Sequence, residues 1–135
     1  MARWRIKNVG MKGVAMAVPE NVVKTSDFDF FSQEEAEVFD NTVGIKRRHI
    51  APDNMCASDM CQAAAEKLLE ELGWERDSID VLLFESVTGD YRTPPTSCIL
   101  QDRLALSENC FCMDIPMGCC GCMYAITVAG NLLTT

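Results

Sequence analysis

The pattern of apolar and polar positions divides the second half of the chain into alternating helices and strands. Residues 58–72, SDMCQAAAEKLLEEL, place apolar side chains at helical spacing, with Ser58 as the candidate N-cap and Gly73 just past the end, which predicts an amphipathic helix. The near-continuous apolar run at residues 79–87, IDVLLFESV, is typical of a strand covered on both faces. The same pattern predicts a helix at 96–106, a second buried strand at 110–115, and at 120–133 a helix that is apolar on every side.

The first half of the chain carries weaker signals. Residues 5–18 alternate and are rich in glycine and valine, which predicts a strand pair or one long bent strand stopped at Pro19. Ser32 stands three residues before Glu35, a capping box that opens a short helix. Residues 43–51, VGIKRRHIA, alternate again as a strand, and His49 within it reads as a structural side chain because no nucleophile lies near it in sequence.

This order of elements predicts an α/β layered fold with right-handed crossovers. The length of 135 residues is that of a single domain, residues 1–135. A helix that is apolar all round must be enclosed by protein, and this short chain has few elements left to enclose one. We therefore expect the chain to be one part of a larger fold.

Charge and hydropathy exclude several classes of partner. A formal net charge of -8 and a pI near 4.5 argue against nucleic acid and against an anionic membrane surface. No segment approaches the roughly 20 apolar residues of a membrane span, and the N-terminus turns polar too early for a signal peptide. These features predict a cytoplasmic protein that carries reduced cysteines.

Eight cysteines are many for this length, and they leave four roles to consider: disulfide partners, metal ligands, packing or a nucleophile. A disulfide framework does not fit a chain without an export signal. The C-x2-C spacing of Cys119 and Cys122 is that of one zinc half-site, but no second such pair follows the expected pattern, so no metal is predicted. Five cysteines read as small buried hydrophobes: Cys56, Cys61, Cys98, Cys110 and Cys112.

Cys119 has a distinct setting. It follows the strand FCMDI and a Pro-Met-Gly turn and stands at the first turn of the apolar helix. The helix dipole and unpaired N–H groups there favour a thiolate, Gly118 permits a close backbone approach, and neighbouring N–H groups could stabilise an oxyanion. The spacing fits an acyl-accepting nucleophile, with packing as the alternative.

Several motifs in order resemble the β-ketoacyl-acyl-carrier-protein synthase III enzymes of the thiolase superfamily. They are GVAMAVPENVV, VGIKRRHIA, SIDVLLFESVTGDYRTPPTSCILQDRL and, as the most specific, DIPMGCCGCMYAITVA. The resemblance spans the whole chain and implies the N-terminal half of a thiolase-like fold: a mixed sheet with helices on both faces and a buried nucleophile helix. By this match Cys119 takes the place of the catalytic cysteine, and substrate binding falls to Thr93, Gly118 and Gly121.

The implied reaction is a decarboxylating Claisen condensation, with no cofactor. Cys119 would accept an acyl group from a thioester of coenzyme A or acyl-carrier protein, and malonyl-acyl-carrier protein would supply the carbanion. The resemblance also implies a homodimer, and it places a supporting His and Asn in a second half. His49 does not match that histidine's motif.

Departures from the family pattern concern the substrate. Val38 and Thr42 stand where relatives that use coenzyme A carry Trp and Arg, and Val43 replaces a Thr. The adenine platform is therefore absent, which argues against acetyl-coenzyme A as the primer and leaves a carrier-protein donor or a longer acyl group as alternatives. Thr93 replaces a Phe that closes the acyl pocket in some relatives, which leaves room for a longer or branched acyl group.

Two alternatives remain open from the sequence. The first keeps Cys119 and changes the reaction to plain acyl transfer or to condensation of the hydroxymethylglutaryl or polyketide type. The second is a metal-binding or purely structural domain whose cysteines do no chemistry.

Overall fold

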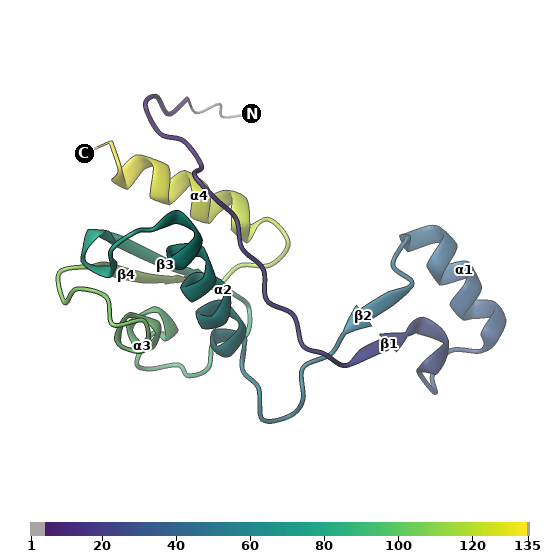
Figure 1. Ribbon diagram of the computed structural model, residues 1–135. Helices are drawn as coiled ribbons and strands as arrows, with labels where there is room; N and C mark the ends of the chain where they lie inside the picture. Colours follow the sequence, from purple (N-terminus) through teal and green to yellow (C-terminus); the bar gives the residue numbers. More distant parts are fainter. Residues whose placement is uncertain (1–4, 135) are drawn as a thin grey trace. The chain divides into compact units, whose positions relative to one another are not determined.

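The chain folds into two compact units, which are described separately. The computed structural model describes residues 5–134 (Figure 1). Of these, residues 5–16 and 57–134 form the larger unit, and residues 17–56 form the smaller unit.

The larger unit is built on a parallel pair of strands, β3 (Val81–Glu85) and β4 (Phe111–Ile115). The pair is aligned with Val81 opposite Phe111 and Glu85 opposite Ile115. Parallel neighbours need a crossover connection, and here that connection is α3 (Thr96–Arg103). The remaining elements of this unit are α2 (Ala57–Leu72), the 3-10 turn η2 (Arg76–Ser78) and α4 (Gly121–Leu132).

The two faces of β3 and β4 are covered by different helices (Figure 1). Alternate strand residues point to opposite faces, so Leu82 and Phe84 face one layer while Val81 and Leu83 face the other. The first layer contains α3 and α2 and holds the buried core of Phe84, Leu100, Leu104, Leu106 and Cys110. The second layer is α4, whose Ala125, Ile126 and Ala129 line a pocket with Val81 and Leu83. The predicted α/β fold is confirmed, although the predicted mixed sheet is present as separate two-stranded sheets, one in each unit.

A carboxylate from β4 caps the N-terminus of α3. The N-cap residue of this helix is Pro95, which has no side-chain cap. Asp114 provides the cap instead, because its two carboxylate oxygens accept hydrogen bonds from the backbone N–H groups of Thr96 and Ser97, each at 2.8 Å. The first N–H groups of a helix lack intrahelical partners and attract negative charge. Asp114 therefore ties the crossover helix to the end of β4.

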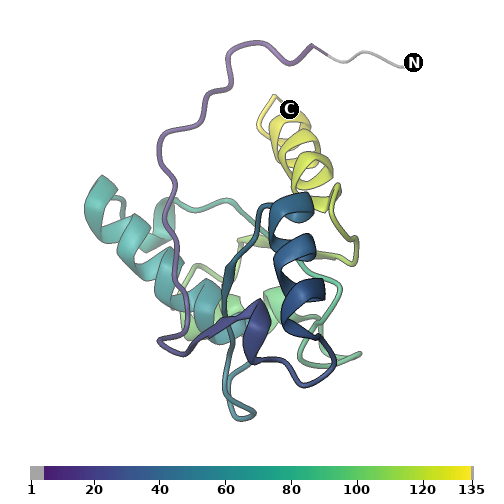
Figure 2. The same ribbon diagram turned by 90° about the vertical axis from the view of Figure 1, so that its right-hand side faces the viewer.

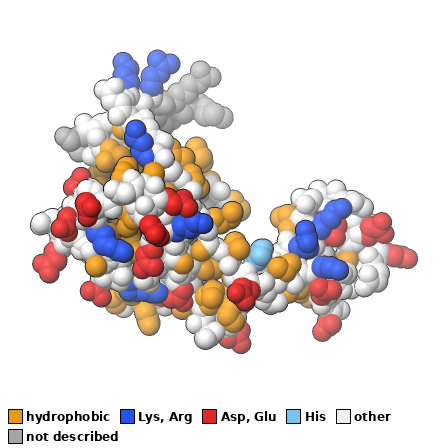
Figure 3. All heavy atoms as spheres, in the orientation of Figure 1, with side chains coloured by type: hydrophobic (Ala, Val, Ile, Leu, Met, Phe, Trp, Pro, Cys, Tyr) orange, Lys and Arg blue, Asp and Glu red, His pale blue; other side chains and the backbone are white. Residues whose placement is uncertain are grey.

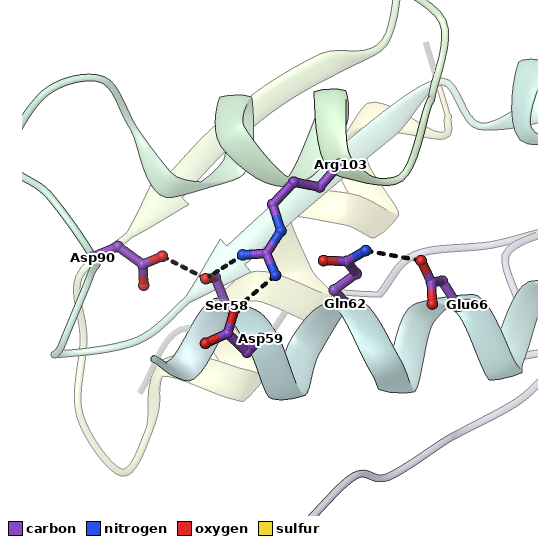
Figure 4. A network of polar contacts seen from close by, with 6 residues as sticks. All are labelled: Ser58, Asp59, Gln62, Glu66, Asp90 and Arg103. Atoms are coloured by element: carbon purple, nitrogen blue, oxygen red, sulfur yellow. Dashed lines mark hydrogen bonds and ion pairs between the residues drawn. The ribbon is translucent and has the colours of Figure 1, made fainter. Parts of the chain in front are cut away.

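A partly buried polar network joins α2, α3 and the loop after β3 (Figure 4). The fully buried Ser58 hydroxyl donates to Asp90 and accepts from Arg103 Nη1 at 3.0 Å. Arg103 Nη2 also donates to Asp59 at 2.7 Å. Ser58 was predicted as the N-cap of α2, but the helix begins at Ala57 and the hydroxyl serves this network instead. The network fixes the loop that leads to Thr93.

Residues 5–18 carry no strand, contrary to the prediction. They run as an extended trace (Figures 1 and 2). A strand exists only where a neighbour pairs with its backbone groups, and within residues 5–134 no strand pairs with this segment. It is held by side chains instead: Gly13 lies so close to α2 that a Cβ there would stand 2.8 Å from Leu68. Alternation indicated the extended backbone correctly, but it does not indicate pairing.

The smaller unit contains an antiparallel pair, β1 (Val22–Lys24) and β2 (Arg47–His49), the turn η1 (Thr25–Asp27) and α1 (Gln33–Val43). The predicted capping box is present: Glu35 N–H donates to Ser32 Oγ at 3.2 Å, and Ser32 N–H donates to Glu35 Oε2 at 2.9 Å. The bond from Ser32 N–H lowers the pKa of the Glu35 carboxyl. Gly44, with φ of 78°, ends the helix in the left-handed region that favours glycine.

Arg48 and His49 of β2 have structural roles within the smaller unit. Arg48 donates to the fully buried Thr25 hydroxyl at 3.3 Å and lies over the rings of Phe28 and Phe39. His49 Nδ1 lies 2.6 Å from the Pro19 carbonyl oxygen. Because a carbonyl only accepts, Nδ1 is the donor.

The helix α4 is not buried in this chain, which corrects the predicted buried nucleophile helix. Met123, Tyr124 and Ile126 are 65%, 54% and 44% exposed. One side of α4 packs on β3, and hydrophobic side chains reach the surface of the larger unit in this region (Figure 3). The reason is that the described residues supply a covering layer for only that side.

Candidate functional site

The candidate site is the turn that joins β4 to α4. Strand β4 ends at Ile115, and the turn is closed by Gly121 N–H, which donates to the Gly118 carbonyl at 2.8 Å. Cys119 lies within this turn, and Cys120 is the N-cap of α4. Cys119 is exposed. The sequence analysis places Cys119 in the first turn of the helix, whereas α4 begins at Gly121 and Cys119 precedes its N-cap. The first N–H groups of a helix have no intrahelical partners, and their action on the Cys119 thiol stays a prediction.

Gly121 is held tightly at the start of α4. It is buried, and a Cβ added there would lie 2.0 Å from Glu85 Oε1. Glu85 is the last residue of β3 and points to the α4 face, so its carboxylate fills the space beside the helix start. The absence of a side chain at residue 121 therefore allows β3 and α4 to approach closely. This contact fixes the turn that carries Cys119.

Gly118 and Thr93 are less constrained in this chain. No atom lies within 4 Å of the position that a Gly118 Cβ would take, and its φ is outside the left-handed region. Thr93 is exposed in the loop after β3. The structure places neither against Cys119, and their substrate-binding role stays a prediction.

A pocket of about 550 Å³ opens at the same edge of the strand pair as the turn. Its lining comes from the loop after β3 and from the start of the turn after β4: Phe84, Ser86, Val87, Gly89, Asp90, Tyr91, Arg92, Pro95, Asp114 and Pro116. The carboxyl ends of parallel strands are the common position of binding sites in open α/β sheets. Thr93 lies between two lining residues, Arg92 and Pro95.

The eight cysteines are thiols and differ in their surroundings. Burial, followed by the charge of the neighbouring Cys110, raises the pKa of Cys112 to about 12. Burial also raises the pKa of Cys110. Both thiols therefore stay protonated at neutral pH, which fits their predicted role in packing.

The packing prediction is wrong for three other cysteines. Cys56, Cys61 and Cys98 are exposed. Cys61 and Cys98 lie on α2 and α3, and a helical pattern read without its tertiary neighbours does not reveal which face is covered.

No group of three or more His, Cys, Asp or Glu side chains that could hold a metal ion is found in the part of the chain that the structure describes. No helix among residues 5–134 is long and apolar enough to cross a membrane.

Comparison with known proteins finds strong similarity over nearly the whole chain. Beta-ketoacyl-[acyl-carrier-protein] synthase III of Geobacillus kaustophilus is 35% identical over 126 residues, which are 93% of this chain and 40% of that protein. The crystal structure of a 3-oxoacyl-(acyl-carrier protein) synthase from Burkholderia xenovorans superposes with a TM-score of 0.82 at 37% identity, over 90% of this chain and 37% of that one. Xanthomonas campestris OleA shares the fold, with a TM-score of 0.84 at 24% identity, over 95% of this chain and 39% of that one. No family model matches the chain.

Fold and turn together define a thiolase-like α/β protein with a cysteine at the strand-to-helix junction. More narrowly, sequence and fold identify the chain as a relative of the beta-ketoacyl-[acyl-carrier-protein] synthase III family, matching its N-terminal part. The chain spans about 40% of the length of the curated relatives that it matches. The resemblance inferred from the four motifs is confirmed.

Sequence reasoning missed three contributors to the site. The sequence pattern places Glu85 in an apolar strand, Asp114 in a motif and Asp90 in a loop, and it indicates no partner for any of them. All three act on partners distant in sequence, at Gly121, at the start of α3 and at Ser58. For Glu85 and Asp114 the available signal was an acidic residue at the end of, or inside, an otherwise apolar strand, because a charge in such a place requires a partner.

Proposed function

We propose that this chain is the N-terminal part of a condensing enzyme in which Cys119 accepts an acyl group from a thioester. The observation that carries the proposal is the exposed Cys119 in the turn before α4, in a chain that matches synthase III proteins over more than nine tenths of its length. Attack by the Cys119 thiolate on the thioester carbonyl forms a tetrahedral oxyanion, which collapses to an acyl-cysteine and releases the donor thiol. Backbone N–H groups of the turn are the candidate oxyanion donors.

The second stage would be condensation with malonyl-acyl-carrier protein. Loss of CO2 from the malonyl group gives a carbanion that attacks the acyl-cysteine, forms the new carbon–carbon bond and returns the Cys119 thiolate. The resemblance assigns a His and an Asn to this stage, in a half that this chain does not contain. Consequently, the chain alone should acquire an acyl group without condensing it, and measured turnover would contradict this.

A carrier-protein donor is the favoured source of the acyl group. Val38 and Thr42, which replace the Trp and Arg of relatives that use coenzyme A, line a groove on α1 of about 510 Å³. Its other lining residues are Phe31, Glu34, Glu35, Phe39 and Val43. This groove offers two carboxylates and no cation to the phosphates of coenzyme A, and Arg48 is engaged by Thr25 and two phenylalanine rings.

Thr93, the exposed face of α4 and the free thiols bear on the acyl chain, the partners and the location of the protein. An exposed Thr93 next to the pocket after β3 would accept a longer or branched acyl group than a Phe there would. The exposed apolar face of α4 supports a second half and a homodimer as its covering partners. Eight thiols are consistent with a reducing, cytoplasmic setting.

Acylation of the isolated chain tests the first stage. The chain is incubated with an acyl thioester of acyl-carrier protein or of coenzyme A, and the fragment 114–135 is released by cleavage before Asp114. We expect an acyl adduct on this fragment that Cys119→Ser abolishes and that Cys120→Ser leaves intact. An adduct that survives Cys119→Ser, or that forms equally on Cys120, would contradict the proposal. Faster transfer from the carrier protein than from coenzyme A is expected, and the reverse order would overturn the donor assignment alone.

A further inference from the structure

Three exposed thiols gather at the start of α4, and the proposed function uses only one of them. Cys119 and Cys120 lie in the turn, and Cys122 lies in the first turn of the helix. In contrast, the two cysteines of the neighbouring strand region, Cys110 and Cys112, are buried or half-buried. The sequence from Cys119 to Cys122 is a C-x-x-C pattern at a helix N-terminus, a setting in which cysteines are reactive.

The backbone runs helically through this cluster. Gly121 N–H donates to the Gly118 carbonyl at 2.8 Å, and Met123 N–H donates to the Cys120 carbonyl at 3.1 Å. Cys120 itself has φ of -93° and ψ of -5°, in the right-handed helical region. Residues three positions apart in such a turn have Cα atoms about 5 to 6 Å apart and lie on the same side.

This geometry selects one pair among the three thiols. A disulfide requires Cα atoms about 4.4 to 6.8 Å apart. Adjacent residues such as Cys119 and Cys120 are held at about 3.8 Å by the trans peptide, which is too short. Cys120 and Cys122 are two positions apart and project from nearly opposite sides of the helix. Cys119 and Cys122 are three positions apart, and the geometry of a helical turn gives such a pair both the distance and the direction.

We propose that Cys119 and Cys122 form a reversible disulfide when the protein meets a hydroperoxide. The Cys119 thiolate attacks one oxygen of hydrogen peroxide, which gives a sulfenic acid and releases hydroxide, and this takes up a proton to become water. The Cys122 thiol then attacks the sulfenic sulfur, forms the S–S bond and loses its proton, and the hydroxyl group leaves as a second water. In sum, two thiols are oxidised by two electrons and one peroxide is reduced to two waters. A dithiol reductant reverses the change by thiol–disulfide exchange.

The disulfide would act as a protective cap on Cys119. A sulfenic acid without a resolving thiol proceeds to sulfinic acid, which is irreversible for most proteins. Pairing depends only on the two thiols and the turn that carries them. Only its consequence, that an oxidised Cys119 cannot be acylated, rests on the proposed function.

The test uses the full chain and the fragment 114–135, which contains these three cysteines and no others. The reduced chain is treated with hydrogen peroxide, denatured, alkylated with iodoacetamide and cleaved before Asp114. We expect a fragment that has lost two of its three alkylatable thiols and two hydrogens, and dithiothreitol before alkylation should restore all three. A fragment that keeps three alkylatable thiols after peroxide would overturn the proposal.

Two variants identify the pair. Cys120→Ser should keep the disulfide and leave no alkylatable thiol, whereas Cys122→Ser should lose it and accumulate sulfinic acid at Cys119. A disulfide that persists in Cys122→Ser would overturn the assignment, as would a bond between two chains, seen as a dimer on non-reducing electrophoresis. If the disulfide forms but Cys119 accepts no acyl group, the proposed function fails and this inference stands. If Cys119 is acylated but no disulfide forms, this inference fails and the proposed function stands.

Discussion

At the start of α4, the Glu85 carboxylate occupies the space that a side chain at residue 121 would need. Gly121→Ala would place a methyl group 2.0 Å from the Glu85 carboxylate oxygen. Because the carboxylate stands at the end of a paired strand, either the side chain or α4 must shift. Overpacking of this kind costs about 1 to 3 kcal/mol of unfolding free energy, measurable by urea denaturation.

Matched variants isolate this contact. Gly118→Ala, three residues away, meets no atom within 4 Å and should change the unfolding free energy by less than about 0.5 kcal/mol. Glu85→Ala should restore much of the stability that Gly121→Ala removes, since the methyl group then has room. A double variant no more stable than Gly121→Ala would show that the contact is not the cause.

The burial of Cys112 predicts a difference in reactivity within one chain. With a pKa of about 12, roughly one Cys112 in ten thousand is a thiolate at about pH 8. Because the pKa is raised, Cys112 becomes reactive only as the pH approaches that value.

Cleavage before Asp102 and Asp114 separates the cysteine pair at residues 110 and 112 from the three thiols at the start of α4. Iodoacetamide should label fragment 114–135 at least about 100-fold faster than Cys112 in fragment 102–113. Equal labelling in the folded chain would contradict the buried environment.

At the scale of elements, α3 depends on a carboxylate from outside the helix. Asp114→Ala removes the acceptor for two N–H groups, each bonded at 2.8 Å. We expect a loss of about 1 to 3 kcal/mol in unfolding free energy, because buried donors are left without a partner. Asp102→Ala is the control, since it removes an exposed carboxylate near the other end of the same helix and should cost less than about 0.5 kcal/mol. Equal losses in the two variants would indicate a general effect of charge.

Elements with strong local signals were predicted from the sequence nearly to their ends. The helix predicted at 58–72 is Ala57–Leu72, and the strand predicted at 110–115 is Phe111–Ile115. The helix predicted to run to residue 106 stops at Arg103, and Ala105 takes a φ of 49°. The apolar pattern of this helix continues past its end because Leu104 and Leu106, in the turn that follows, are buried in the core. Burial alone cannot distinguish a helix from the turn that follows it.

The site was predictable where chemistry is local. The turn before α4 follows from Pro, Gly and an apolar run close together in sequence. The contact of Glu85 with Gly121 joins residues 36 positions apart, the difference between 121 and 85, and no spacing rule reaches that far. The same limit explains why a strand was predicted at residues 5–18, where none is present, and why the exposure of Cys61 was not predicted.

At the scale of the whole molecule, the uncovered side of α4 should drive self-association. Met123 and Tyr124 are 65% and 54% exposed, and apolar patches of this kind bind one another in water. Sedimentation velocity over a concentration series should show association that Met123→Lys with Tyr124→Lys weakens about tenfold or more. Met11→Lys changes a residue 70% exposed on the N-terminal segment and serves as the control. Association that responds equally to all these changes would point to net charge rather than to α4.

The bond between His49 and Pro19 has a consequence for the way the smaller unit is held together. His49 is the last residue of β2, and its Nδ1 donates to the Pro19 carbonyl oxygen at 2.6 Å. The backbone bonds between β1 and β2 join residues 22–24 to residues 47–49. The single histidine of this chain therefore extends the connection from β2 to residue 19, three positions before the first residue of β1.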